Sequence, residues 1–287
     1  MYDFCVIVPV KNAEDTVAAQ IDALVDQSWP GSGEVVVVDN GSNDNTAVIA
    51  QSRGSSSKLV RVLDASRSIG AGAARNFGAA HSQSRLLLFC DADDVVAPTW
   101  ISAMVEAMET HAAATGPLEV DALNPTWLAD SRGRSHLDRL DVFLDTFPYA
   151  SSCNFGIHRE LFHALGGFDE TFLIGEDVEL CHRVWRRGVT LGFASEATVA
   201  YRYRHSSWAR WQQGVAFGAV APAIAVRLRS NRDCNVPPRA AGLRQWFWLL
   251  RHMRYLRTRS GRARWSWVAA GCVGRVAGSI RAGSLLL

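Results

Sequence analysis

The first 110 residues alternate between short apolar segments and helical patterns, and this alternation constrains the fold more than any other feature of the sequence. The apolar segments, rich in Val, Ile and Leu, are Phe4–Val10, Glu34–Asp39, Leu59–Leu63 and Arg85–Cys90. Segments with few polar positions are typical of parallel strands covered by helices on both faces. Apolar residues recur at helical spacing at positions 17, 21, 24 and 25, and again at 101, 104, 105 and 108. The pattern predicts βαβ units, in which ligands bind at the carboxyl ends of the strands.

The middle of the chain is less regular. Residues 111–153 contain Gly, Pro, Asp and Ser interruptions, with a loop expected at 130–136. The pattern after this stretch predicts two short helices, one strand and one long helix, over Arg159–Leu165, Glu176–Arg187, Val199–Arg204 and Ser207–Arg229. Asn231–Pro238 contains several breakers, and we place a domain boundary there.

Charge is distributed unevenly along the chain. The 287 residues are 48% hydrophobic and 20% charged, which excludes collagen-like, low-complexity and disordered classes. The net charge is +2, but residues 239–287 hold ten arginines and no acidic residue. This segment carries +10, so residues 1–233 carry −8. The first part of the chain is therefore acidic and its C-terminal segment strongly basic.

Cysteine spacing and the N-terminal residues bear on location. Six cysteines are scattered without a CxxC pair, which predicts buried free thiols rather than a disulfide framework or a zinc site. The chain runs from Met1 directly into an apolar segment without a basic leader. No apolar stretch reaches the roughly 18 residues of a membrane span. We expect a cytoplasmic protein.

Polar residues follow three of the predicted strands. The ends read Pro9-Val10-Lys11-Asn12, then Asp39 through Thr46, then Asp91-Ala92-Asp93-Asp94. Residues 40–46 are also what a turn and a helix cap require, so both interpretations stay open there. Asp91 and Asp93, two positions apart beyond a strand, can both reach a hard divalent cation, which prefers oxygen ligands.

A second acidic cluster precedes the predicted helix at 176–187. Its carboxylates are Asp169, Glu170, Glu176, Asp177 and Glu179. Acidic residues at a helix N-terminus also act as ordinary caps, stabilised by the helix dipole, and this alternative stays open for Glu176 and Asp177.

Taken together, five motifs resemble those of family-2 glycosyltransferases. They are VIVPVKN, VVVVDNGSNDNT, ARNFGAA, LFCDADD and GGFDETFLIGEDVELCHRVWRRG, in that order within residues 4–230. The resemblance implies a GT-A fold, an α/β architecture with a Rossmann-like, mostly parallel twisted sheet and helices on both faces. Residues 1–230 would form this domain, with a nucleotide-binding half over about 1–110 and an acceptor-binding half over about 111–230. Residues 231–287 would form a basic, Trp-rich helical extension.

The resemblance also assigns roles to single residues. On the nucleotide side, the matched residues are Pro9, Val10, Asn12, Asp39, Asn40, Arg75, Asp91 and Ala92. Pro9 and its neighbours would line the base pocket, Asp39 would bind the base or ribose, and Arg75 would lie near the nucleotide. Asn40 departs from the Asp-Asp pair of many members, although it still offers a hydrogen-bond acceptor.

The metal and catalytic residues follow from the remaining motifs. Asp91 and Asp93 match the DXD pair, the first near the ribose and the second on Mg²⁺ or Mn²⁺. Asp177 matches the catalytic base of a Glu-Asp motif, beside Glu176. His205 stands where many members place a histidine near the metal and diphosphate, although a capping or core histidine is the equal alternative.

The implied reaction is inverting transfer of a sugar from a nucleotide-diphospho-sugar, UDP-linked by family default, to an acceptor hydroxyl. A carboxylate would remove the proton of the acceptor as the new bond forms, and the metal would neutralise the leaving diphosphate. The QxxRW signature of processive members is absent around Trp208–Trp211, so we expect one transfer per event. The acceptor, either a glycan or a lipid-linked molecule, is not readable from the sequence.

The basic tail predicts an amphipathic helix over Arg244–Arg259. Apolar residues recur on one face and arginines on another, followed by Trp265 and Trp267. This composition favours attachment of residues 239–287 to an anionic membrane surface, peripherally on the inner face of the cell membrane. A helix docked on the domain by its Trp face is the alternative.

Three other functions compete with glycosyl transfer. A nucleotidyltransferase that makes nucleotide-sugars usually has a Gly-rich loop after the first strand, where this chain has Val10-Lys11-Asn12-Ala13. Binding of nucleic acid through the Arg/Trp tail is disfavoured by the acidic main body, so we expect no nucleic-acid partner. A degenerate, non-catalytic family member is disfavoured by the intact Asp91, Asp93 and Asp177.

Overall fold

The computed structural model describes residues 2–29, 31–55, 57, 59–132, 139–230, 242–284 and 286. The chain forms two compact units. Unit 1 comprises Met1–Leu123, Ser135–Asp141 and Pro148–Arg202, and unit 2 comprises Asn124–Arg134, Val142–Phe147 and Tyr203–Leu287. The division between the units falls at Arg202, and the boundary expected at 231–238 lies wholly outside the described residues. The helix before that boundary belongs to unit 2.

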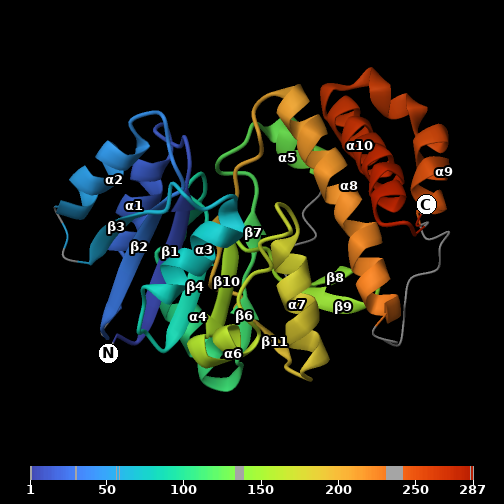
Figure 1. The fold of residues 1–287 in the computed structure, drawn as a ribbon. Helices are drawn as coiled ribbons and strands as arrows, with labels where there is room; N and C mark the ends of the chain where they lie inside the picture. Colours follow the sequence, from blue (N-terminus) through green and yellow to red (C-terminus); the bar gives the residue numbers. More distant parts are fainter. Residues whose placement is uncertain are drawn as a thin grey trace. The chain divides into compact units, whose positions relative to one another are not determined.

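A seven-stranded sheet forms the centre of unit 1 (Figure 1). Its spatial order is β11-β6-β10-β4-β1-β2-β3, and only β10 runs antiparallel to its neighbours. The strands are β1 (Phe4–Val10), β2 (Gly33–Asp39), β3 (Val60–Asp64), β4 (Leu86–Cys90), β6 (Ala113–Thr115), β10 (Asn154–His158) and β11 (Leu191–Phe193). The four N-terminal strands agree with the expected segments, and the mostly parallel α/β sheet is confirmed.

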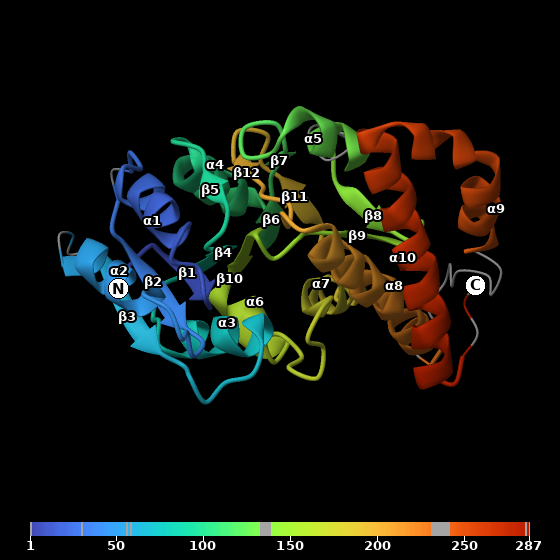
Figure 2. The same cartoon turned by 90° about the horizontal axis from the view of Figure 1, so that it is seen from above.

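Helices cover both faces of this sheet, because alternate side chains of the buried strands point to opposite sides (Figure 2). On one face, helices α1, α2 and α4 pack on Val6, Val8 and neighbouring apolar residues. On the other, α3 approaches Ile7 and α6 contributes to an aromatic cluster around Phe89. The helices are α1 (Val17–Val25), α2 (Thr46–Ser55), α3 (Ala71–Ala80), α4 (Trp100–Thr110), α6 (Arg159–Ala164) and α7 (Glu176–Arg186).

Two smaller sheets complete the strands. β5 (Val95–Val96), β12 (Val199–Ala200) and β7 (Leu118–Glu119) form one of them. The strand expected over Val199–Arg204 is therefore confined to its first two residues. β8 (Asp141–Phe143) and β9 (Phe147–Tyr149) form the other small sheet.

Unit 2 is mostly helical. Its helices are α5 (Thr126–Arg132), α8 (Ser207–Ser230), α9 (Leu243–Arg251), the 3₁₀ helix η1 (Met253–Arg257) and α10 (Arg259–Arg281). The helix expected over Arg244–Arg259 is thus interrupted after Arg251 and continues as η1. Glycines let α8 and α10 approach closely: a Cβ on Gly218 would lie 2.2 Å from the carbonyl oxygen of Gly271.

Two further expectations are met by the described residues. All five cysteines among them, at positions 5, 90, 153, 181 and 272, are free and buried. Within the same part of the chain, no helix is both long and apolar enough to cross a membrane.

Candidate active site

The antiparallel direction of β10 brings two polar segments to the same edge of the sheet. Asn154, the first residue of β10, pairs with Cys90, the last residue of β4. The residues just before β10 therefore lie beside those just after β4. Ser152 belongs to the first group and Asp91 to the second, and α7 supplies further carboxylates to this edge.

Arg75 connects the two acidic clusters. Its guanidinium donates to Asp91 Oδ1 at 2.5 Å and to Glu176 Oε1 at 2.8 Å. The Arg75 side chain is 2% exposed and that of Glu176 is 8% exposed, so the pair is desolvated. The motif of α3 thus links the residue after β4 to the residue that begins α7. Both of these hydrogen bonds go to protein carboxylates. Arg75 therefore orients the acidic groups expected to bind metal and acceptor.

The carboxylate of Asp177 is held in a fixed position at the start of α7. The backbone N–H of Ser152 donates to Asp177 Oδ2 at 3.1 Å, and that of Val178 donates to Oδ1 at 2.8 Å. Burial raises the pKa of Asp177 above its usual value, although these two hydrogen bonds oppose the shift. Burial and the neighbouring Asp177 raise the pKa of Glu176 to about 7, with Arg75 opposing.

Asp94 lies in the LFCDADD motif, but the resemblance assigned it no role at the site. It is 1% exposed, and its Oδ1 accepts the backbone N–H of Arg202 at 2.8 Å. Its Oδ2 is buried without a hydrogen-bond partner. Burial, followed by repulsion from Asp93 and Asp91, raises its pKa well above the usual value. Arg202 also donates through Nε to the carbonyl of Asp93, so the segment after β12 fixes the acidic loop.

The acidic loop could hold a cation. Ligand atoms of Asp91, Asp94 and Cys153 lie within 4.8 Å of one another. Burial raises the pKa of the Cys153 thiol well above its usual value, so this group is protonated and a poor metal ligand. The carboxylates of Asp91 and Asp94 repel one another, and Asp94 Oδ2 has no hydrogen-bond donor. These oxygens fit a hard divalent cation such as Mg²⁺ or Mn²⁺.

Two residues expected to bind nucleotide hold loops in place. Asn40 is 6% exposed, and its side-chain amide donates to the carbonyls of Ala65 and Ser68. Asn12 lies at a left-handed φ of 51°, and its Oδ1 accepts the backbone N–H of Asn43. These side chains pin the loops that follow β1, β2 and β3 to one another.

Other nucleotide candidates lie on the same strand ends. Asp39 ends β2, and its Oδ1 accepts from the backbone and hydroxyl of Ser42. Val10 and Ala92 are buried, whereas Pro9 is partly exposed. The structure thus gathers Pro9, Val10, Asn12, Asp39 and Asn40 at the ends of adjacent strands β1 and β2, as expected.

His205 belongs to unit 2. Its side chain is exposed, which removes the alternative of a core histidine, and its backbone carbonyl accepts a hydrogen bond from Arg210 at 2.6 Å. Its role as a metal ligand remains a prediction.

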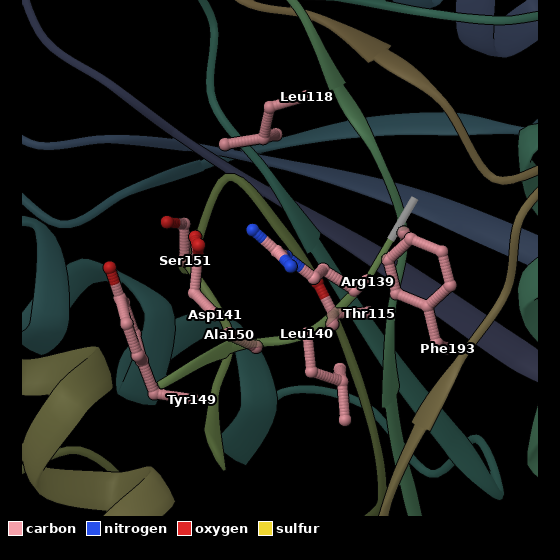
Figure 3. A pocket seen from close by; sticks show the side chains of 10 residues that line it. Thr115, Leu118, Arg139, Leu140, Asp141, Tyr149, Ala150, Ser151 and Phe193 are labelled. Atoms are coloured by element: carbon pink, nitrogen blue, oxygen red, sulfur yellow. The ribbon is translucent and has the colours of Figure 1, made fainter. Parts of the chain in front are cut away.

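A pocket is lined by Ser151, the residue before the one that binds Asp177. Figure 3 shows it lined by polar side chains of Arg139, Asp141, Tyr149 and Ser151, together with apolar ones such as Phe193. Ser151 directly precedes Ser152, whose N–H binds Asp177. Burial, followed by the nearby Asp141, raises the pKa of Tyr149 above its usual value, so its hydroxyl stays protonated.

Comparison with known proteins agrees with this geometry. The model of glycosyl transferase family 2 matches residues 5–166, and that of glycosyl transferase family group 2 matches residues 86–280. Both models describe glycosyltransferases. The chain belongs to glycosyl transferase family 2. This assignment removes the nucleotidyltransferase alternative.

Two relatives indicate the breadth of this family. The chain is 29% identical over 204 residues to succinoglycan biosynthesis protein ExoU of Rhizobium meliloti, covering 65% of this chain and 58% of that protein. It is 26% identical over 200 residues to glycosyltransferase AglE of Haloferax volcanii, covering 67% of this chain and 64% of that protein. The matched regions thus span about three fifths of the length of these relatives.

Solved structures confirm the GT-A fold. Mannosyltransferase PcManGT from Pyrobaculum calidifontis, in complex with GDP-Man and Mn²⁺, matches with a TM-score of 0.63 and 19% identity, covering 98% of this chain and 77% of that one. S. aureus TarS 1–349 in complex with UDP-GlcNAc matches with a TM-score of 0.57 and 17% identity, covering 98% and 92%.

Proposed function

We propose that this glycosyltransferase transfers a sugar from a nucleotide-diphospho-sugar to an acceptor hydroxyl, with inversion and one transfer per event. The observation that carries the proposal is the buried Arg75 bridge between Asp91 and Glu176, which ties the acidic loop after β4 to the start of α7. A donor-side carboxylate and a proton-accepting carboxylate are thereby held at one sheet edge. Relatives of this fold that bind GDP-Man or UDP-GlcNAc support a nucleotide-sugar donor.

Asp177 is the general base in this proposal. A base must be ionised and fixed within reach of the hydroxyl proton, and its efficiency is greatest when its pKa is near the working pH. Two backbone N–H groups orient Asp177, and burial raises its pKa toward that range. Glu176, bound to Arg75, acts as a positioning residue beside it.

Asp91 and Asp93 would hold Mg²⁺ or Mn²⁺, together with Asp94, whose carboxylate lies within 4.8 Å of that of Asp91. When bound, the cation would neutralise the charge that develops on the leaving diphosphate. Asp39 and the ends of β1 and β2 would bind the nucleoside, with UDP as the first candidate. The pocket of Figure 3 would bind a single polar group of the acceptor, because it adjoins the Ser152–Asp177 contact. Its Arg139 and Tyr149 would donate hydrogen bonds to the hydroxyl or anionic groups of a glycan or lipid-linked acceptor.

Melting temperatures with UDP, GDP, dTDP and CDP, each with and without Mn²⁺, test the donor side. A ligand at 100 times its Kd adds about 2.7 kcal/mol of stability. We expect a Mn²⁺-dependent shift for one nucleotide, lost in Asp93→Ala and kept in the control Glu106→Gln, an exposed carboxylate on α4. The proposal would be contradicted if none of the four nucleotides raised the melting temperature.

Asp177→Asn separates binding from chemistry. The amide keeps the shape of the side chain but cannot accept the acceptor proton, so transfer should fall by about 10²–10⁴-fold. The nucleotide-induced shift should remain. Transfer at the wild-type rate by Asp177→Asn would assign the base elsewhere.

A further inference from the structure

Helices α9 and η1 present an apolar stripe to solvent. Phe247, Leu250 and Met253 are 69%, 71% and 58% exposed. The stripe consists of Leu243, Trp246, Phe247, Leu250, Met253 and Leu256, which recur about every three to four residues. Within α9 this spacing places Leu243, Trp246, Phe247 and Leu250 along one side of the helix, and η1 extends the exposed apolar surface with Met253 and Leu256. Contiguous exposed apolar side chains on a soluble surface mark an interaction site.

The stripe is not the face by which α9 is attached to its own unit. That attachment uses Leu249, which is 5% exposed and packs with Ala269 and Cys272 of α10. Trp265 of α10 also donates through Nε1 to the carbonyl of Leu249 at 3.0 Å. The helix is therefore anchored to α10 by one face, while a second apolar face is left uncovered by the described residues.

The charged residues within the described segment 243–257 are all arginines. Arg244 and Arg251 of α9 and Arg254 and Arg257 of η1 are exposed. Residues 239–287 contain ten arginines and no acidic residue, so this segment favours an anionic partner. Arginines beside an exposed apolar face are typical of helices that lie in the headgroup region of a bilayer. Four of the six stripe residues are Leu or Met, which cannot stack on bases, so a bilayer suits the stripe better than a single-stranded nucleic acid.

We propose that the apolar stripe inserts into the interface of an anionic lipid bilayer while Arg244, Arg251, Arg254 and Arg257 contact lipid headgroups. The helix lies on the membrane and does not span it. The proposal concerns residues outside the reaction site and does not rest on the reaction, so failure of either leaves the other standing.

Vesicle co-sedimentation of the full chain tests this proposal. The vesicles are pure phosphatidylcholine, or phosphatidylcholine with about one third phosphatidylglycerol. We expect binding to the anionic vesicles only, weakened by added salt because the arginine contribution is screened. The double variant Phe247→Ser/Leu250→Ser should bind about tenfold or more weakly than wild type. It lacks two apolar side chains whose transfer from water into the bilayer would favour binding. Ile280→Ser removes an equally exposed side chain on α10, outside the stripe, and should bind like wild type.

Independent measurements keep the result interpretable. The double variant should melt at the wild-type temperature, because both residues are mostly exposed. In the wild-type chain, anionic vesicles should slow amide hydrogen exchange within residues 243–257. The proposal is overturned if the anionic vesicles do not bind, or if the double variant and wild type bind equally. It is also overturned if the double variant still binds the vesicles and has lost only self-association, or only binding of single-stranded RNA.

Discussion

Replacing Arg75 by Met should destabilise unit 1 in a pH-dependent way. Met keeps most of the volume but removes the cation shared by Asp91 and Glu176, 2.5 and 2.8 Å from the guanidinium nitrogens. Removing one partner from a buried ion pair costs about 3–5 kcal/mol, because a charge is left without compensation. Total stabilities of about 5–15 kcal/mol leave room for the variant to fold.

The pH dependence follows from Glu176. Its pKa is about 7 in the folded chain against 4.5 ordinarily, so the folded state binds the proton more tightly. Its titration therefore lowers the free energy of unfolding as the pH rises from 4.5 to about 7. Without Arg75 the folded pKa rises further. The deficit of Arg75→Met should thus be smallest at about pH 5, where Glu176 is protonated with or without Arg75, and should grow as the pH rises above about 7.

Hydrogen exchange of the β4 amides measures this deficit within unit 1. These amides, Leu86–Cys90, lie at the centre of the sheet and exchange through its global opening. Adding Glu176→Gln to Arg75→Met should restore part of the lost stability, because the stranded carboxylate is gone. A loss below about 1 kcal/mol at pH 8, or an equal loss at both pH values, would refute the assignment of the bridge as a desolvated ion pair.

Three further predictions concern packing and the thiols. Gly78→Ala places a Cβ 2.7 Å from Ile7 Cγ2, so denaturant titration should show a loss of about 1–3 kcal/mol in the free energy of unfolding. The control Gly271→Ala on α10 faces open space and should raise the free energy of unfolding by about 0.5–1 kcal/mol. Asn154→Ala removes hydrogen bonds to the Trp100 indole and to two carbonyls, and should lower stability by about 3 kcal/mol or more in the same titration. The five described cysteines are buried, so in a Cys234→Ser variant a thiol reagent should label the chain only after unfolding, and rapid labelling of that variant in its native state would contradict this.

The sequence predicted the parallel half of the sheet because its strands are apolar on both faces. β10 escaped prediction, since its segment begins with the fully buried Asn154 and contains Gly156. A Cβ on Gly156 would lie 2.5 Å from Met108 Sδ, a constraint set by a helix about 50 positions away. Pairing between distant segments leaves no local periodicity to recognise.

The same distinction holds at the site. Acids at strand ends were identifiable because their strands were, and the structure brings Asp91, Arg75 and the Glu176–Asp177 motif together as one network. Asp94 was the last letter of the recognised motif LFCDADD, yet it is held by the backbone N–H of Arg202, more than 100 positions later. The pocket beside Ser151 comes from the irregular stretch, whose turns and short strands carry no pattern in sequence.

The bridge formed by Arg75 has a consequence for synthesis of the chain. Its partner Glu176 lies 101 positions further on, and the backbone that supports Asp94 lies 108 positions beyond it. A nascent chain that has emerged only to about residue 150 therefore has an Arg75 guanidinium without its Glu176 partner and an acidic loop without the backbone support of Arg202. We expect the first strands to stay open to unfolding on the ribosome until α7 and β12 have emerged. A ribosome stalled before residue 176 has emerged should accordingly leave β4 open to proteolysis, and one stalled after residue 202 has emerged should protect it.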